Sequence, residues 1–200
     1  MTEARLKGAK IATVTVEYSA TASKCDEVVV IRPGSDPAFA LGLAQVIISK
    51  NQYDADWVAQ NTDLPFLIRM DTLEPLRPKD FIKGFVEPDL KSIHFVKEGD
   101  KSKDKLKQFA SESMKGEFQP YVVIDKRGQT KVVTRDDFGK NCEKLGISPK
   151  LNVETTVKLL DGKSVKVRSG FHLMREYLNK NFTPAKTSAI TGAPVEGVLK

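Results

Sequence analysis

The fold is decided by Lys10-Ile11-Ala12-Thr13-Val14-Thr15-Val16 and, further along the chain, by Glu27-Val28-Val29-Val30-Ile31. Both stretches are rich in β-branched residues and carry a charge only at their first position. That pattern is typical of strands buried on both faces of a parallel sheet. Because a helix is predicted directly after the second stretch, the first part of the chain is expected to layer buried strands against helices.

The helix after the second strand is predicted to cover residues 37–49. Asp36 is a favourable N-cap and Pro37 suits the first helical position. Apolar residues then recur at helical spacing and should form the buried face, namely Phe39, Ala40, Leu43, Val46 and Ile47. A second helix is expected over residues 54–61, with Trp57 facing the core.

The chain opens on the polar turns of a short helix that ends at Gly8 and runs at once into the first strand. A buried parallel strand needs a neighbour on each side, yet only one clear partner follows. We therefore expect a partial doubly wound parallel sheet, with an irregular insertion and β-hairpins later in the chain. On this interpretation the chain is an internal fragment of a longer protein.

Four segments are expected along the chain. Residues 1–70 form part of an α/β cofactor-binding domain. Residues 71–118 form an irregular surface insertion with one short helix over residues 106–114. Residues 119–182 form β-hairpins and a helix, and residues 183–200 begin the next helical segment.

The hairpins rest on turn signals. Asp125-Lys126-Arg127-Gly128 separates two β-branched runs, and Asp161-Gly162 separates two runs in which valines alternate with polar residues. Residues 170–181 then predict a helix with the apolar stripe Phe171, Leu173, Met174, Tyr177 and Leu178. Thr183-Pro184 opens another helix that ends at Thr191-Gly192.

Composition argues against several classes of protein. The net charge of +6 arises from lysines interspersed with acidic residues, which describes a solvated surface and not a nucleic-acid-binding stripe. The sequence contains no run of about 18 apolar residues, the length needed to span a membrane. Cys25 and Cys142 lie far apart without iron–sulfur spacing, and His94 and His172 are isolated. We therefore expect no catalytic residue and no metal ligand in this chain, with each histidine at the surface or satisfied by local partners.

Three segments together resemble one enzyme family. Residues 3–18 comprise a helix, a strand and the acidic strand end Glu17. Residues 25–47 contain Arg32-Pro33-Gly34-Ser35-Asp36, similar to a Pro-Gly-Thr-Asp turn, and an alanine-rich helix. Residues 183–194 run from Thr183-Pro184 to Ile190-Thr191-Gly192-Ala193-Pro194 and are similar to a Thr-Pro-Glu … Ile-Thr-Gly-Val-Pro segment. This order resembles the catalytic subunits of the bis-molybdopterin guanine dinucleotide oxidoreductases, the dimethyl sulfoxide reductase superfamily.

Within that superfamily, residues 57–67 and 131–137 look most like the alpha subunits of respiratory nitrate reductases and nitrite oxidoreductases. The resemblance is close over residues 1–70, poor over 71–118 and moderate over 119–200. It implies a molybdenum bis(molybdopterin guanine dinucleotide) cofactor and a 4Fe-4S cluster whose ligands lie outside this chain.

The resemblance also implies cofactor-binding roles for Glu17, Arg32, Gly34, Ser35 and Asp36. Asp36 would accept hydrogen bonds from N1–H and N2–H of guanine, and Glu17, where the family usually has Asp, would contact ribose or guanine. Gly34 and Ser35 would offer backbone N–H groups before a helix N-terminus. Alternatives remain open: Asp36 can serve as a plain N-cap, Glu17 as a solvated loop acid, and Arg32 as a structural or a phosphate-facing residue.

The function implied is nitrite oxidation to nitrate or nitrate reduction to nitrite by the parent catalytic subunit, with no turnover expected from this chain alone. Alternatives are a relative that reduces chlorate or selenate or oxidises a hydrocarbon, and a free-standing nucleotide-binding α/β module. The implied partners are an iron–sulfur beta subunit and a membrane-anchor or haem subunit, through which the complex would be membrane-associated; no nucleic acid is expected.

Overall fold

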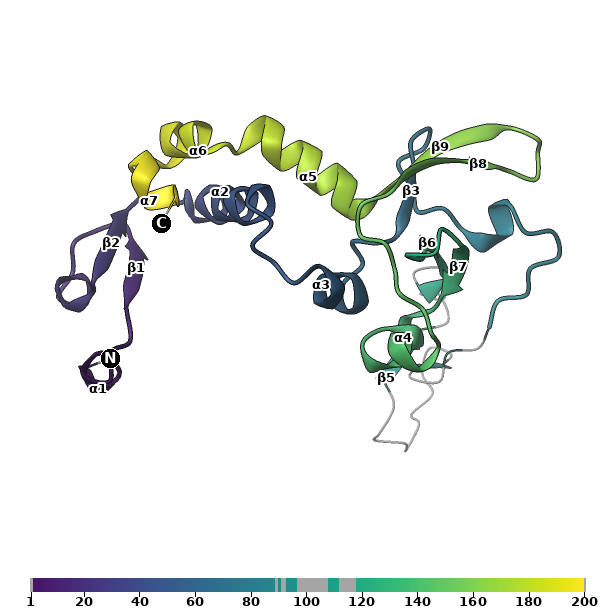
Figure 1. Cartoon of the computed structure of the whole chain (residues 1–200), viewed down its shortest axis with the longest axis horizontal. Helices are drawn as coiled ribbons and strands as arrows, with labels where there is room; N and C mark the ends of the chain where they lie inside the picture. The colour runs from purple at the N-terminus through teal and green to yellow at the C-terminus, as the bar shows by residue number, and fades with distance from the viewer. Residues whose placement is uncertain (1, 89, 91–92, 97–107, 112–117, 200) are drawn as a thin grey trace. The chain divides into compact units, whose positions relative to one another are not determined.

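The computed structural model describes residues 2–88, 90, 93–96, 108–111 and 118–199. Two compact units divide the chain, and each is described by itself. Unit 1 comprises Met1–Tyr53 and Met174–Lys200, and unit 2 comprises Asp54–Leu173. The chain is a mixed α/β protein with small parallel and antiparallel sheets, which confirms the predicted class at this level (Figure 1).

Unit 1 begins with α1 (Thr2–Leu6), followed by Gly8 at a φ of +85°. The strands β1 (Ala12–Thr15) and β2 (Glu27–Val30) pair in parallel, with Ala12 opposite Glu27. A 3-10 turn, η1 (Ala22–Lys24), lies in the connection between them. The helix end and both strands are therefore where the sequence predicts them.

The expectation that both strands are buried on both faces is wrong for this structure. Val14 is 45% exposed, Val16 48% and Val30 44%. Within unit 1, β1 and β2 form a two-stranded sheet, and Val29 of β2 and Ile31 directly after it pack against the helices. The outward side chains stay exposed because the described part of the chain supplies neither a third strand nor a second covering layer.

The helical layer of unit 1 consists of α2 (Asp36–Ser49), α6 (Pro184–Thr191) and α7 (Val195–Leu199), which lie against one another (Figure 1). Its core contains Ile31, Phe39, Val46, Ala193 and Val198. Gly42 marks a close approach of α2 to α6, since a Cβ there would lie 2.5 Å from the Thr187 side chain.

The two predicted helix starts differ in outcome. Ser35, and not Asp36, is the N-cap of α2, so Asp36 occupies the first helical position and Pro37 the second. The shift arises because residues 32–35 already form a turn that delivers Ser35 to the helix. For α6, the predicted boundaries are confirmed: Thr183 is the N-cap, and Gly192 ends the helix in the left-handed conformation.

Unit 2 is built on an antiparallel sheet in the order β3-β9-β8. Its strands are β3 (Leu67–Arg69), β8 (Glu154–Lys158) and β9 (Ser164–Ser169). A second hairpin joins β6 (Tyr121–Ile124) to β7 (Thr130–Val133). Both predicted hairpins are confirmed, and the core beneath them contains Leu67, Leu76, Val122, Val153, Leu159, Val165 and Val167.

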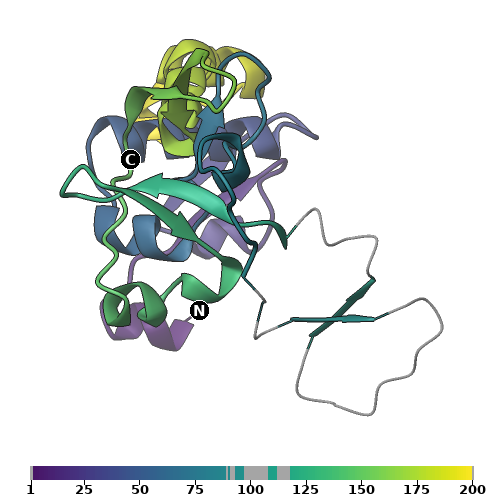
Figure 2. The same cartoon turned by 90° about the vertical axis from the view of Figure 1, so that its right-hand side faces the viewer.

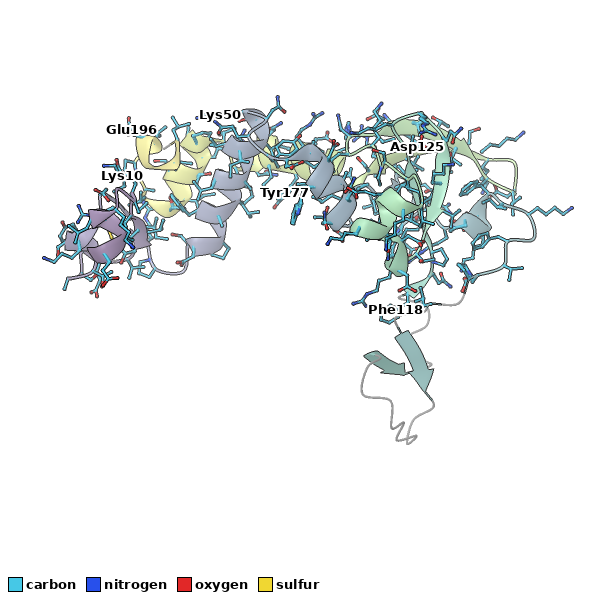
Figure 3. All side chains as sticks on the ribbon, turned by 60° about the horizontal axis from the view of Figure 1, so that its bottom comes forward. Lys10, Lys50, Phe118, Asp125, Tyr177 and Glu196 are labelled. Atoms are coloured by element: carbon cyan, nitrogen blue, oxygen red, sulfur yellow. The ribbon has the colours of Figure 1, made fainter. Side chains whose placement is uncertain are left out.

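The turn of the β6–β7 hairpin depends on Asp125, which is labelled in Figure 3 and is only 2% exposed. Its Oδ1 accepts the amides of Arg127 and Gln129, each at 2.9 Å. Gly128 takes a φ of +80°, which a residue with a side chain adopts only at a cost.

The remaining helices are α3 (Ala55–Asn61), α4 (Lys140–Lys144) and α5 (Gly170–Asn181), with 3-10 turns η2 (Pro78–Asp80) and η4 (Arg135–Asp137). The sequence predicts α3 and α5, and both are confirmed, but parts of their predicted apolar faces are wrong. Trp57 on α3 is 60% exposed, and Tyr177 on α5, labelled in Figure 3, is 56% exposed. Helical spacing identifies a face but not whether a second element covers it.

Within residues 71–118, β4 (Ile93–Val96) and β5 (Gln108–Ser111) form a parallel pair, drawn in teal in Figure 2. The short helix predicted over residues 106–114 is therefore wrong at 108–111. Pairing with the β-branched and aromatic segment Ile93–Val96 outweighs the weak helical preference of these residues. The rest of that predicted helix lies outside the described residues.

Candidate nucleotide-binding site

The candidate site lies in unit 1, beyond the carboxyl ends of β1 and β2. Thr15 is paired with Val30, so Glu17 and Arg32 each lie two residues beyond a paired strand end. The amide of Ile31 donates to the carbonyl of Thr15 at 2.8 Å and extends this register. Ligands of open α/β sheets bind at this edge, so the strand order places both candidate segments where a ligand is expected.

The 32–36 turn is held by its own hydrogen bonds. The carbonyl of Arg32 accepts the Ser35 hydroxyl at 2.6 Å and the Ser35 amide at 3.2 Å. Gly34 takes a φ of +75°, and a Cβ there would meet open space. Both groups of Ser35 that can donate a hydrogen bond are therefore used inside the turn.

Arg32 makes its contacts with the C-terminal end of α6. Its amide donates to the carbonyl of Thr191 at 2.7 Å. Its Nη1 donates to the carbonyls of Ala189 at 2.8 Å and Ile190 at 3.0 Å. The carbonyls at the end of a helix have no partner within the helix and carry partial negative charge, so a guanidinium is well suited to them.

The carboxylates of Asp36 and Glu17 are both exposed. Within the described part of the chain, neither is in a hydrogen bond or an ion pair through its side chain. Glu17 is held only by its backbone, which exchanges hydrogen bonds with the Thr15 hydroxyl at 2.9 and 3.3 Å. Asp36 lies in the first turn of α2, where the helix dipole favours a negative charge.

The cysteines and histidines are not brought together. Among the described residues, no group of three or more His, Cys, Asp or Glu side chains could hold a metal ion. Cys142 is buried, its Sγ donates to the carbonyl of Asp137, and burial raises the pKa of its thiol. Nδ1 of His172 lies 2.9 Å from Asn152, which confirms that His172 has local partners. The side chain of His94 lies outside the described residues.

A polar cavity of about 380 Å³ in unit 2 was not predicted from the sequence. It is lined by Arg69, Glu74, Pro75, Arg77, Lys79, Asp80 and Gln119. Arg69 binds both oxygens of Asp71, at 3.0 and 2.7 Å, and Nη1 of Arg77 donates to the Gln119 carbonyl at 2.8 Å. Because these guanidinium groups are already bound to protein, we interpret the cavity as the surface of a structural network.

The contribution of α6 to the site was also missed. Arg32 and Ala189 are 157 residues apart in sequence. The only local signal was Gly192, which the sequence assigns to a helix end.

Among the described residues, no helix is both long and apolar enough to cross a membrane.

Comparison with known proteins finds relatives along the whole chain. The chain is 31% identical over 201 residues to the perchlorate reductase subunit alpha of Dechloromonas aromatica, a match that covers 100% of this chain and 21% of the relative. It is 31% identical over 176 residues to the respiratory nitrate reductase subunit alpha of Haloferax mediterranei, covering 88% of this chain and 16% of the relative. The chain is homologous to the alpha subunits of the molybdopterin oxidoreductases.

Other relatives agree. The chlorate reductase subunit alpha of Ideonella dechloratans is 37% identical over 79 residues, covering 40% of this chain and 9% of the relative. No family model matches the chain. The chain spans about a fifth of the length of the perchlorate reductase relative and less of the others. Members of the molybdopterin oxidoreductase family use a molybdenum cofactor, and their alpha subunits belong to complexes with other subunits.

Proposed function

We propose that this chain binds the guanosine end of a molybdopterin guanine dinucleotide within the catalytic subunit of a molybdenum oxidoreductase. In this proposal the molybdenum centre supplies the redox chemistry, and the residues of this chain hold the nucleotide that anchors it. The observation that carries the proposal is the exposed carboxylate of Asp36, with no partner among the described residues, on a turn held by hydrogen bonds at the strand ends.

The chemistry of Asp36 fits guanine. A carboxylate has two acceptor oxygens and can take the N1–H and N2–H donors of guanine side by side, a pair that adenine does not offer. Charge-assisted hydrogen bonds of this kind are stronger than neutral ones. The fixed backbone of the 32–36 turn reduces the entropy that binding would cost.

Glu17 and Gly34 fit the rest of the nucleoside. Glu17 lies at the neighbouring strand end with an exposed carboxylate that can accept hydrogen bonds from the ribose diol. Gly34 has room above its Cα, so a ligand could approach its backbone closely. Glu17, Arg32, Gly34, Ser35 and Asp36 thus remain the proposed cofactor-binding set, with Arg32 and Ser35 acting through their hydrogen bonds to the protein.

The exposed valines of β1 and β2 support a larger sheet. α2 is apolar around most of its circumference, with Leu41 37% and Ile47 42% exposed, and a helix of that composition is usually covered on several sides. We infer that β1 and β2 are two strands of a doubly wound parallel sheet, that residues 1–70 belong to that cofactor-binding domain, and that 71–118 is an insertion before the hairpin segment 119–182 and the helical segment 183–200.

The proposed reaction of the whole protein is the interconversion of nitrate and nitrite, with a bis(molybdopterin guanine dinucleotide) cofactor, a 4Fe-4S cluster, an iron–sulfur beta subunit and a membrane-anchor or haem subunit. Respiratory nitrate reductase relatives support this choice. A second candidate is reduction of a chlorine oxyanion, because the match with a perchlorate reductase alpha subunit runs over 100% of this chain.

The guanine contact can be tested by calorimetric titration of the chain with GMP, IMP and AMP. Wild type should bind GMP more tightly than IMP, which lacks the 2-amino group, and should discriminate against AMP. Asp36→Asn should weaken GMP binding about tenfold or more, as expected for loss of hydrogen bonds to a charged group.

The matched control is Glu196→Gln, an exposed acid in the first turn of α7 in the same unit. It should leave GMP affinity unchanged. Absence of GMP binding by wild type, or equal affinities for the two variants, would contradict the proposed function.

A further inference from the structure

We propose that the C-terminal end of α6 positions the nucleotide-binding turn through Arg32, and that Arg32 is a positioning residue and not a phosphate contact. This inference rests on the proposed function of the 32–36 turn. It assigns a role in cofactor binding to residues 189–192, which lie far from the turn in sequence.

The Arg32 side chain is bound to the C-terminal end of α6. Its Nη1 is shared between the carbonyls of Ala189 and Ile190, and its backbone amide binds the carbonyl of Thr191. Three consecutive carbonyls of one helix end are thus satisfied by a single residue. A guanidinium used in this way is directed at the helix terminus, where its charge offsets the negative end of the dipole.

Gly192, which has no side chain, leaves space for the stem of Arg32. Gly192 has a φ of +76°, a conformation that residues with a Cβ adopt at a cost. A Cβ at Gly192 would also lie 3.3 Å from Cγ and 3.4 Å from Nε of Arg32. Glycine is therefore favoured at the end of α6 by its backbone conformation, and a Cβ there would crowd the stem of Arg32, which would have to shift by a few tenths of an ångström.

Arg32 in turn fixes the residues that precede Asp36. The carbonyl of Arg32 accepts both donors of Ser35, which is only 9% exposed, and the carbonyl of Ser35 accepts the amide of Phe39 in α2. Fixing Arg32 on α6 therefore fixes Ser35 and the start of α2. Asp36 follows Ser35 directly, so its carboxylate takes its position from the end of α6.

The two roles of Arg32 predict different ligand dependence. A phosphate contact would matter for GMP and not for guanosine, which has no phosphate. A positioning residue would matter equally for both, since both depend on the same turn. The same reasoning applies to Gly192→Ala, which retains the positive charge of Arg32 but displaces its side chain.

The test is titration of the full chain with guanosine and with GMP, for wild type, Arg32→Ala, Arg32→Lys and Gly192→Ala, below the melting temperature of each. We expect Arg32→Ala and Gly192→Ala to lose about tenfold in affinity for both ligands by the same factor. Arg32→Lys should lose affinity for both as well, because an ammonium does not reproduce the reach and planar geometry of the guanidinium.

Val46→Ala is the stability control, because Val46 belongs to the same core but lies further along α2. It should lower the melting temperature and leave both affinities unchanged. Loss of GMP affinity alone in Arg32→Ala, with guanosine binding intact, would overturn the inference and leave the proposed function standing. Equal losses in Val46→Ala would overturn it as a general effect of stability. Failure of wild type to bind either ligand would overturn the proposed function itself.

Discussion

Two neighbouring residues at the start of α2 have different roles, since one stabilises the turn and the other is exposed to solvent. Ser35 uses its hydroxyl and its amide within the protein, whereas Asp36 keeps its carboxylate exposed. The observed N-cap, Ser35, lies only one residue before the predicted N-cap, Asp36. The difference matters chemically, because a carboxylate engaged in capping would be less available to a ligand.

Ser35→Ala should lower the free energy of unfolding by about 1 kcal/mol, since it leaves the Arg32 carbonyl short of one part-buried hydrogen bond. Chemical denaturation would measure this. Ser23→Ala removes the same kind of bond, from Ser23 Oγ to the carbonyl three residues earlier, at an exposed position. It should cost less, and equal costs would argue against a specific role of the Ser35 turn.

Asp26 makes the stability of unit 1 depend on pH. The amide of Ile11 donates to its carboxylate, and with help from Arg5 and Lys10 this holds the pKa of Asp26 below its usual value of 3.8. A carboxyl with a lowered folded-state pKa stabilises the protein above its unfolded-state pKa, and that contribution is lost as the pH falls through the folded value.

Asp26→Asn should therefore have a lower melting temperature than wild type at pH 7. The difference should start to shrink as the pH falls below the usual value of 3.8, and should be lost once the pH has fallen through the lower folded-state pKa, where the folded wild-type carboxyl becomes protonated. Thermal unfolding followed by circular dichroism, at pH 7 and at a pH below 3.8, would measure the difference in melting temperature. A difference that is unchanged or larger in acid would contradict this account of Asp26.

At the scale of elements, α2 and α6 approach closely at Gly42. Gly42→Ala would place a methyl group 2.5 Å from Cγ2 and Oγ1 of the fully buried Thr187. Overpacking of a core costs about 1–3 kcal/mol, which should exceed the gain of roughly 1 kcal/mol in helix propensity. We expect a net loss of stability in chemical denaturation.

A double-mutant cycle with Thr187→Ala separates the clash from other effects. Because Thr187→Ala removes Cγ2 and Oγ1, the two atoms nearest to the new methyl group, the double variant should be less destabilised than the sum of the single variants. Strict additivity would show that the two side chains do not meet.

Elements with local signals could be predicted from the sequence. Asp161-Gly162 identified the β8–β9 hairpin, and Thr183-Pro184 with Gly192 identified both ends of α6. Features that depend on distant partners could not. Gln108–Ser111 is a strand through its pairing with Ile93–Val96, Trp57 is exposed although its helix was predicted correctly, and the contact of Arg32 with α6 joins residues 157 positions apart.

At the scale of the whole molecule, each unit has its own core. Val46→Ala should reduce hydrogen-exchange protection in unit 1, and Val167→Ala should reduce it in unit 2. Exchange measured by mass spectrometry on both variants would resolve the two effects. Loss of protection throughout the chain in both variants would show that the units unfold together.

The location of the candidate site stays a prediction from the sequence, whereas the hydrogen bonds that hold its turn were found only in the structure. The residues at the strand ends followed from a family resemblance and the edge rule of parallel sheets. The homology to molybdopterin oxidoreductase alpha subunits agrees with that resemblance. The anchoring of the turn on α6 required the structure, because no local pattern couples Arg32 to a helix end so distant in sequence.

The most direct test of the guanosine site is an NMR titration of the ¹⁵N-labelled chain with GMP. We expect GMP to shift the amide signals of Glu17, Gly34 and Asp36 most, and AMP at the same concentration to change them little. Shifts concentrated around the Arg69–Arg77 cavity of unit 2, or no shifts with GMP at all, would contradict this expectation.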